Sequence, residues 1–90
     1  MITGRLMTTP ILRNLIASGL AGQLIARGVA GGFVLVMSNR GAEQKLASQR
    51  QPDEPRVFRR LDTLAGFLKD LGALTALIEL EDWDGGNSTD

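Results

Sequence analysis

Three arginines gather immediately before a predicted helix. Arg56 and Arg60 lie four positions apart on one side of a predicted strand, and Arg59 and Arg60 directly precede the helix. Guanidinium groups and the free N–H groups of a helix N-terminus both attract phosphate. The cluster is therefore a candidate contact for a nucleic-acid backbone, and Arg40 and Arg50 are candidates to extend it. An alternative partner for the same arginines is the acidic C-terminal part of the chain.

The charge of the chain changes sign along its length. Residues 1–60 carry nine Lys/Arg and three Asp/Glu, a net charge of +6, whereas residues 61–90 carry one lysine and seven acids, a net charge of −6. Such asymmetry can mark a surface for nucleic acid or for an acidic partner. It is also expected if two solvated faces complement each other, within one molecule or across a dimer.

The residue types present offer little catalytic chemistry. The chain has no cysteine and no histidine, which excludes thiolate nucleophiles, Ser-His-Asp triads and the usual zinc sites. Asp62 with Asp70, or Glu79 with Glu81, is a formal acid–base pair, but nothing else in the sequence supports that role and solvated carboxylates explain them. The glycines in 28–32 follow a predicted helix, the reverse of a phosphate-binding loop. We therefore expect no enzyme, no cofactor and no metal site.

The first half of the chain predicts a helix followed by a hairpin. Thr9-Pro10 is a helix-start signal, and apolar residues recur at helical spacing until Gly28. Residues 33–38 are apolar on both faces, which is typical of a central strand. A turn at 39–41 leads into a more polar returning strand at 43–49.

The second half predicts a strand, a helix and a strand. After a loop with two prolines at 51–55, residues 56–60 form the first of these strands and residues 61–71 the helix, which Gly72 ends. Residues 73–83 alternate in the manner of a strand. One side of that strand is expected in the core: Leu74, Ala76, Ile78 and Leu80.

These elements predict an α+β domain of order α-β-β-β-α-β. Two helices should cover one face of a mostly antiparallel sheet of three to four strands, because each helix has one apolar stripe to bury. We expect an N-terminal extension at 1–9, the domain at 10–83 and a flexible acidic tail at 84–90. The other sheet face is a candidate homodimer surface, since it is predicted to be uncovered and apolar. Its residues would be Val34, Val36, Leu77 and Trp83.

Two families resemble this chain. The order α-β-β-β-α resembles double-stranded-RNA-binding domains, but their lysine-rich helix start has no counterpart in LDTLAGFLKD, so RNA binding is not implied. The chain is also similar, over residues 10–83, to the ParC-type family of small plasmid partition-associated proteins. That likeness rests on a GFVLV strand and on the pattern PRVFRRLDTLAGFLKDLGA, at Pro55, Arg56, Phe58, Leu61, Asp62, Leu64, Leu68, Leu71 and Gly72. It implies an accessory role in plasmid or mobile-element maintenance in a bacterium, with no catalytic residue.

We therefore predict a small, non-catalytic protein-interaction domain in the cytoplasm, acting on a protein partner or as a homodimer. No window of ~18 uncharged apolar residues exists, so no membrane span is expected. The alternative is a nucleic-acid-binding regulator that uses the arginines named above. A third possibility is a small-ligand binder, with the ligand between the first helix and the sheet.

Overall fold

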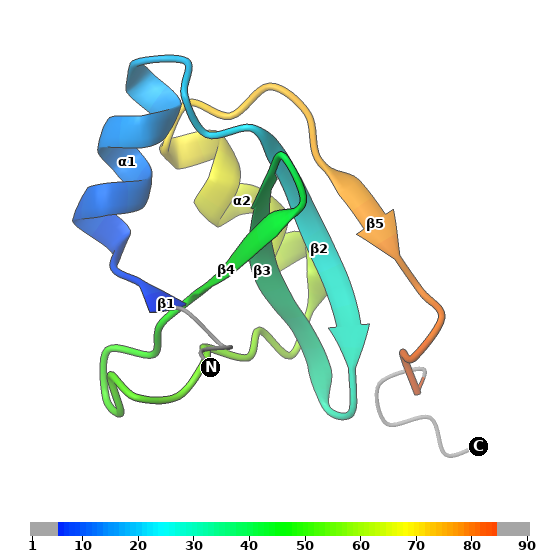
Figure 1. Ribbon diagram of the computed structural model, residues 1–90. Helices are drawn as coiled ribbons and strands as arrows, with labels where there is room; N and C mark the ends of the chain where they lie inside the picture. The colour runs from blue at the N-terminus through cyan, green and yellow to red at the C-terminus, as the bar shows by residue number, and fades with distance from the viewer. Residues whose placement is uncertain (1–5, 85–90) are drawn as a thin grey trace.

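The structure, a computed structural model, describes residues 6–84 as one sheet with two helices (Figure 1). The elements run in the order β1 (Leu6–Met7), α1 (Thr9–Ala17), β2 (Gln23–Val29), β3 (Gly32–Asn39), β4 (Ala42–Leu46), α2 (Leu61–Asp70) and β5 (Leu77–Glu79). The predicted α+β class is confirmed.

The sheet has five strands in the order β1-β4-β3-β2-β5. The three central strands are antiparallel, and the short outer strands β1 and β5 pair in parallel with β4 and β2. The sheet is therefore mixed and larger than the predicted three to four strands.

Both helices cover the same face of the sheet, as expected (Figure 1). Their buried residues pack against alternate residues of the central strands in one core, which includes Leu12 of α1, Leu64 and Leu68 of α2, and Phe33 and Leu35 of β3. The intervening residues of the strands form a smaller buried cluster on the opposite face, made of Ile25, Val34 and Val36. This alternation is the period-2 pattern of a strand that is buried on both sides.

The predicted first helix is too long. The observed helix α1 ends at Ala17. The residues predicted to form the second half of that helix, Gln23–Val29, form β2 instead. Gly19 and Gly22 between them have φ values of +76° and +71°, in the left-handed region that ends helices. Since a two-residue connection at Ala30-Gly31 then returns the chain into β3, β2 pairs with β3 along its whole length.

The predicted turn at 39–41 is confirmed. Its left-handed residues are Arg40 and Gly41, with φ values of +54° and +85°. Positive φ at both central residues matches the right-handed twist of the strands that a two-residue hairpin connects.

The predicted strand at 56–60 is wrong. Only Phe58 forms a bridge there, antiparallel to Phe33, because β4 already occupies that side of β3 from Val36 onward. The backbones come so close that a Cβ atom on Gly32 would lie 2.0 Å from the carbonyl oxygen of Phe58. The predicted second helix is confirmed as α2, and Gly72 follows it with a φ of +96°.

The two ends of the domain also differ from expectation. β1 pairs with β4 and Met7 is buried, so residues expected in an N-terminal extension belong to the sheet. At the other end only Leu77–Glu79 is a strand. Asp84, expected in the tail, accepts a hydrogen bond from the Gly31 amide; the rest of the expected tail, 85–90, and residues 1–5 lie outside the described residues.

Candidate interaction surface

Exposed apolar side chains concentrate around β5. Among the described residues, eight large apolar side chains are exposed, and five of them lie between positions 74 and 83. We call these five the β5 surface: Leu74, Leu77, Ile78, Leu80 and Trp83. Leu74, with 95% of its surface exposed, is the extreme case. The prediction that Leu74, Ala76, Ile78 and Leu80 lie in the core is wrong, since only three residues of this segment pair with the sheet.

A groove of about 640 Å³ lies beside this surface, between α2 and the segment that leads into β5. Its walls are apolar apart from Lys69 and Thr75. The residues of α2 that line it recur on one side of the helix, and Ile78 lines it from β5. The groove exists because the core residues of α2 pack on the central strands, while the segment after Gly72 passes α2 without filling the space.

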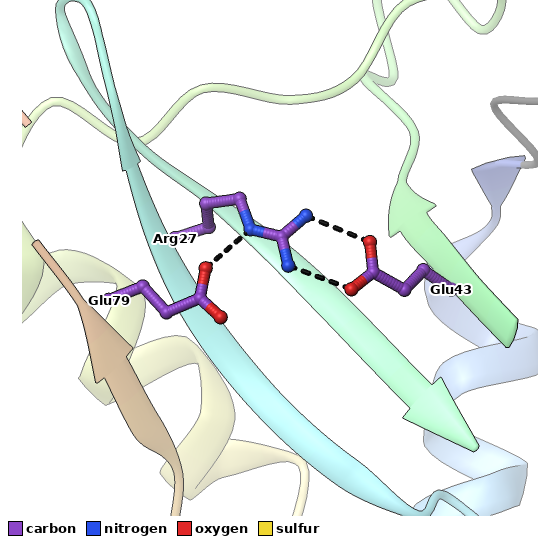
Figure 2. Close-up of polar contacts among 3 residues, drawn as sticks. All are labelled: Arg27, Glu43 and Glu79. Carbon is purple, nitrogen blue, oxygen red and sulfur yellow. Dashed lines mark hydrogen bonds and ion pairs between the residues drawn. The ribbon is translucent and has the colours of Figure 1, made fainter. Parts of the chain in front are cut away.

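One arginine fastens β5 to the sheet. Figure 2 shows Arg27 of β2 between Glu43 of β4 and Glu79 of β5. Its Nε donates to Glu79 Oε1 over 2.6 Å, and its two terminal nitrogens donate to the Glu43 oxygens over 2.8 Å each. The hydrogen bonds to Glu43, followed by the bond to Glu79, raise the pKa of the Arg27 guanidinium. In return, hydrogen bonding from Arg27 lowers the pKa of the Glu43 carboxyl. Arg27 therefore stays charged. Its pair with Glu79 connects the positively charged first part of the chain with the negatively charged second part.

A second contact holds the C-terminal end of the β5 surface. Trp83 packs on Phe33 with ring centroids 5.3 Å apart. Gly28 makes this approach possible, because a Cβ atom there would stand 2.4 Å from the Trp83 Cβ. β5 is thus fixed at Glu79 and Trp83, while Leu74, Leu77 and Leu80 remain exposed.

The arginines predicted to contact a nucleic acid or an acidic partner have different surroundings in the structure. Arg56 stacks over Phe58 and Phe67, with 4.2 and 5.2 Å to the ring centroids. Arg60 pairs with Asp62, which raises the Arg60 pKa and lowers that of Asp62. Arg59 is exposed.

The two other predicted arginines come from separate connections. Arg40 lies in the β3–β4 turn and Arg50 in the loop after β4. Binding to nucleic acid stays a prediction, which a mobility-shift assay at low salt tests. The acidic residue of β5, Glu79, pairs instead with Arg27, which no motif in the sequence marks.

The residues predicted for the dimer surface do not lie on one surface. Val34 and Val36 are buried, and the Arg27 side chain lies on their side of the sheet. Leu77 is on that face and exposed, whereas Trp83 packs against Phe33 of the helix-side core. The signal that could have found the β5 surface is the apolar content of residues 74–83, which exceeds what a three-residue strand can bury.

The groove beside α2 does not coincide with the third predicted site, between the first helix and the sheet. Within residues 6–84, no three acidic side chains come together in a way that could hold a metal ion. Neither helix in that part of the chain has the length and apolar character needed to cross a membrane. No family model, curated protein or solved structure matches the chain.

Proposed function

We propose that this chain is a small, non-catalytic protein-interaction domain and that the β5 surface is where its partner binds. The observation that carries the proposal is that five of the eight large apolar side chains exposed within residues 6–84 lie in a stretch of ten residues, 74–83. Several exposed apolar side chains close together commonly mark an interaction site, while single exposed apolar residues need no explanation.

The chemistry of the remaining polar residues supports a binding role. The sequence has no histidine or cysteine to act as base or nucleophile. The carboxylates of Glu43 and Glu79 bind Arg27, and that of Asp62 binds Arg60. Carboxylates engaged in this way are poor general bases, because hydrogen bonds from an arginine occupy the lone pairs that would accept a proton.

We further propose that the domain serves as an accessory factor in plasmid or mobile-element maintenance in the bacterial cytoplasm. The support is the resemblance of residues 10–83 to the ParC-type family described above. Partition or replication genes next to the gene for this chain are the expected finding. A gene neighbourhood devoted consistently to unrelated functions would count against this role.

Site-specific photo-crosslinking in cells tests the interaction surface. A photoreactive amino acid in place of Leu74, 95% exposed, is compared with the same replacement of Leu20, 62% exposed and close to α1. We expect one identified protein, or a second copy of the chain, to crosslink at position 74 and not at position 20. Equal yields at both positions, or no defined product at 74, would show that the β5 surface is not the contact.

A further inference from the structure

We propose that the free edge of β5 binds an extended peptide of a partner protein as an additional strand, and that this peptide alternates apolar side chains and carries Lys or Arg where it passes Glu81 and Asp82. The proposal rests on the proposed function and specifies its partner. Three features of the β5 region support it: an open strand edge, an adjoining groove and unpaired negative charge.

The first feature is the open edge. β5 pairs with β2 on one side, and no strand within residues 6–84 pairs with it on the other. The outward N–H and C=O groups of an edge strand are a template for another strand. Edge strands are often protected by charged residues or by proline. β5 instead presents Leu77 and Ile78, each about half exposed, and only Glu79 is charged.

The second feature is the groove. It reaches Ile78 on the helix side of β5 and is walled by α2. In a strand added to β5, every second side chain points to this side, next to the groove, and the others lie beside Leu77. An edge strand with a neighbouring helix thus supplies main-chain hydrogen bonds for affinity and an apolar wall for alternate side chains. This geometry favours an extended peptide with apolar residues at every second position.

The third feature is charge. Residues 73–84 carry four carboxylates and no Lys or Arg. Glu79 is bound by Arg27 and Asp84 accepts a hydrogen bond from Gly31. Glu81 and Asp82 are exposed, and no ion pair to either is formed among the described residues. Cationic side chains on the partner complement this end of the strand.

Charge also distinguishes a basic peptide from a second copy of the chain. If β5 paired with β5 of another copy in the antiparallel sense, Glu81 and Asp82 would approach the partner's residues 73–78. That segment is uncharged, so the two acids would gain no cation. A basic extended peptide can pair with the backbone groups of β5 and also place a cation beside Glu81 and Asp82.

The test is selection of binders to the full chain from a library of random linear peptides displayed on phage, followed by NMR titration of the ¹⁵N-labelled chain with the most enriched peptide. We expect enriched sequences to alternate apolar residues and to include Lys or Arg. Shift changes should map to residues 73–84 and to the groove side of α2. The double variant Glu81→Lys/Asp82→Lys should weaken binding about three- to thirtyfold. The matched control, Asp53→Lys/Glu54→Lys, reverses two exposed acids in the loop after β4 and should leave affinity unchanged.

Several results would overturn the inference: no enriched peptide, enriched peptides without basic residues, shift changes away from β5, or equal weakening by both double variants. A dimeric mass in light scattering that Leu77→Ser abolishes would assign the edge to a second copy instead. If position 74 crosslinks to a protein in cells while no linear peptide binds, the proposed function stands and the extended peptide is excluded.

Discussion

Replacement of Gly28 by alanine tests how the C-terminal segment is held against the sheet. A Cβ atom at this position of β2 would stand 2.4 Å from the Cβ of Trp83 and 3.1 Å from the carbonyl oxygen of Glu79. The φ of Gly28 lies outside the left-handed region, so alanine introduces a clash without backbone strain. To restore an ordinary contact of 3.4 Å, Trp83 must move away by about 1 Å.

The cost of the Gly28→Ala substitution is bounded by two routes. Keeping the segment in place with an extra methyl group costs about 1–3 kcal/mol. Releasing Trp83, which is 39% exposed, uncovers on the order of 150 Å² and costs at most about 4 kcal/mol. The ring contact with Phe33 contributes a further ~0.5–1.5 kcal/mol. Because the protein takes the cheaper route, we expect a loss of about 1–3 kcal/mol from a total stability of about 5–13 kcal/mol.

Trp83 is the single tryptophan, so its fluorescence reports on this contact directly. Because Trp83 is displaced by about 1 Å even when the segment stays in place, Gly28→Ala should shift the emission to the red, increase quenching by acrylamide and lower the urea midpoint. Gly66→Ala is the matched control, since nothing lies within 4 Å of the added Cβ in α2. It should raise stability by about 0.5–1 kcal/mol and leave the emission unchanged. Unchanged emission and midpoint in Gly28→Ala would refute the packing of Trp83 on β2.

Three further substitutions test the core, the contact between Gly32 and the Phe58 backbone, and the ion pairs of Arg27. Leu68→Ala, in the buried face of α2, should cost about 2–5 kcal/mol in urea unfolding, and an unchanged midpoint would contradict the placement of the helix. Gly32 has a φ of +150°, and an added Cβ would clash with the backbone of Phe58, so Gly32→Ala should lower the stability by about 2–5 kcal/mol. A change below ~0.5 kcal/mol would contradict the close approach of the Phe58 backbone to Gly32. Glu43→Gln should cost about 0.2–1 kcal/mol at neutral pH, a small value because the carboxylate is 41% exposed. Since Arg27 lowers the Glu43 pKa below its ordinary 4.5, this stabilisation is complete above that pH and is lost as the pH falls through the folded-state pKa; a difference from the wild type that stays constant down to pH 3 would contradict it.

The sequence located α2 and β3 because local signals agreed there. In α2 the apolar spacing, an acid in the first turn and Gly72 all indicate the same helix. Between residues 18 and 29, apolar residues at helical spacing competed with Gly19 and Gly22. The helix ends at these glycines because residues 23–29 pair as β2 along their full length with β3. Local periodicity contains no information about such pairing between strands.

The candidate surface could not be found by pattern alone, for a related reason. Alternation in residues 73–83 predicts a strand but not how much of it finds a partner. Charge and strand face predict candidate contact residues, but neither property indicates which side chains pair. Arg56 is engaged by the two rings beneath it, and Arg27, which has no distinctive sequence context, bridges strands that are distant in the chain.

By itself, the sequence determined the α+β class, one central strand, one helix and the absence of histidine and cysteine chemistry. These follow from composition and from periodicities that act over a few residues. Only the tertiary structure decided that residues 23–29 form a strand, that Arg27 joins β4 to β5, and that Leu74, Leu77 and Leu80 stay exposed. Exposure depends on which segments compete for a limited core, and that competition is settled by the whole chain at once.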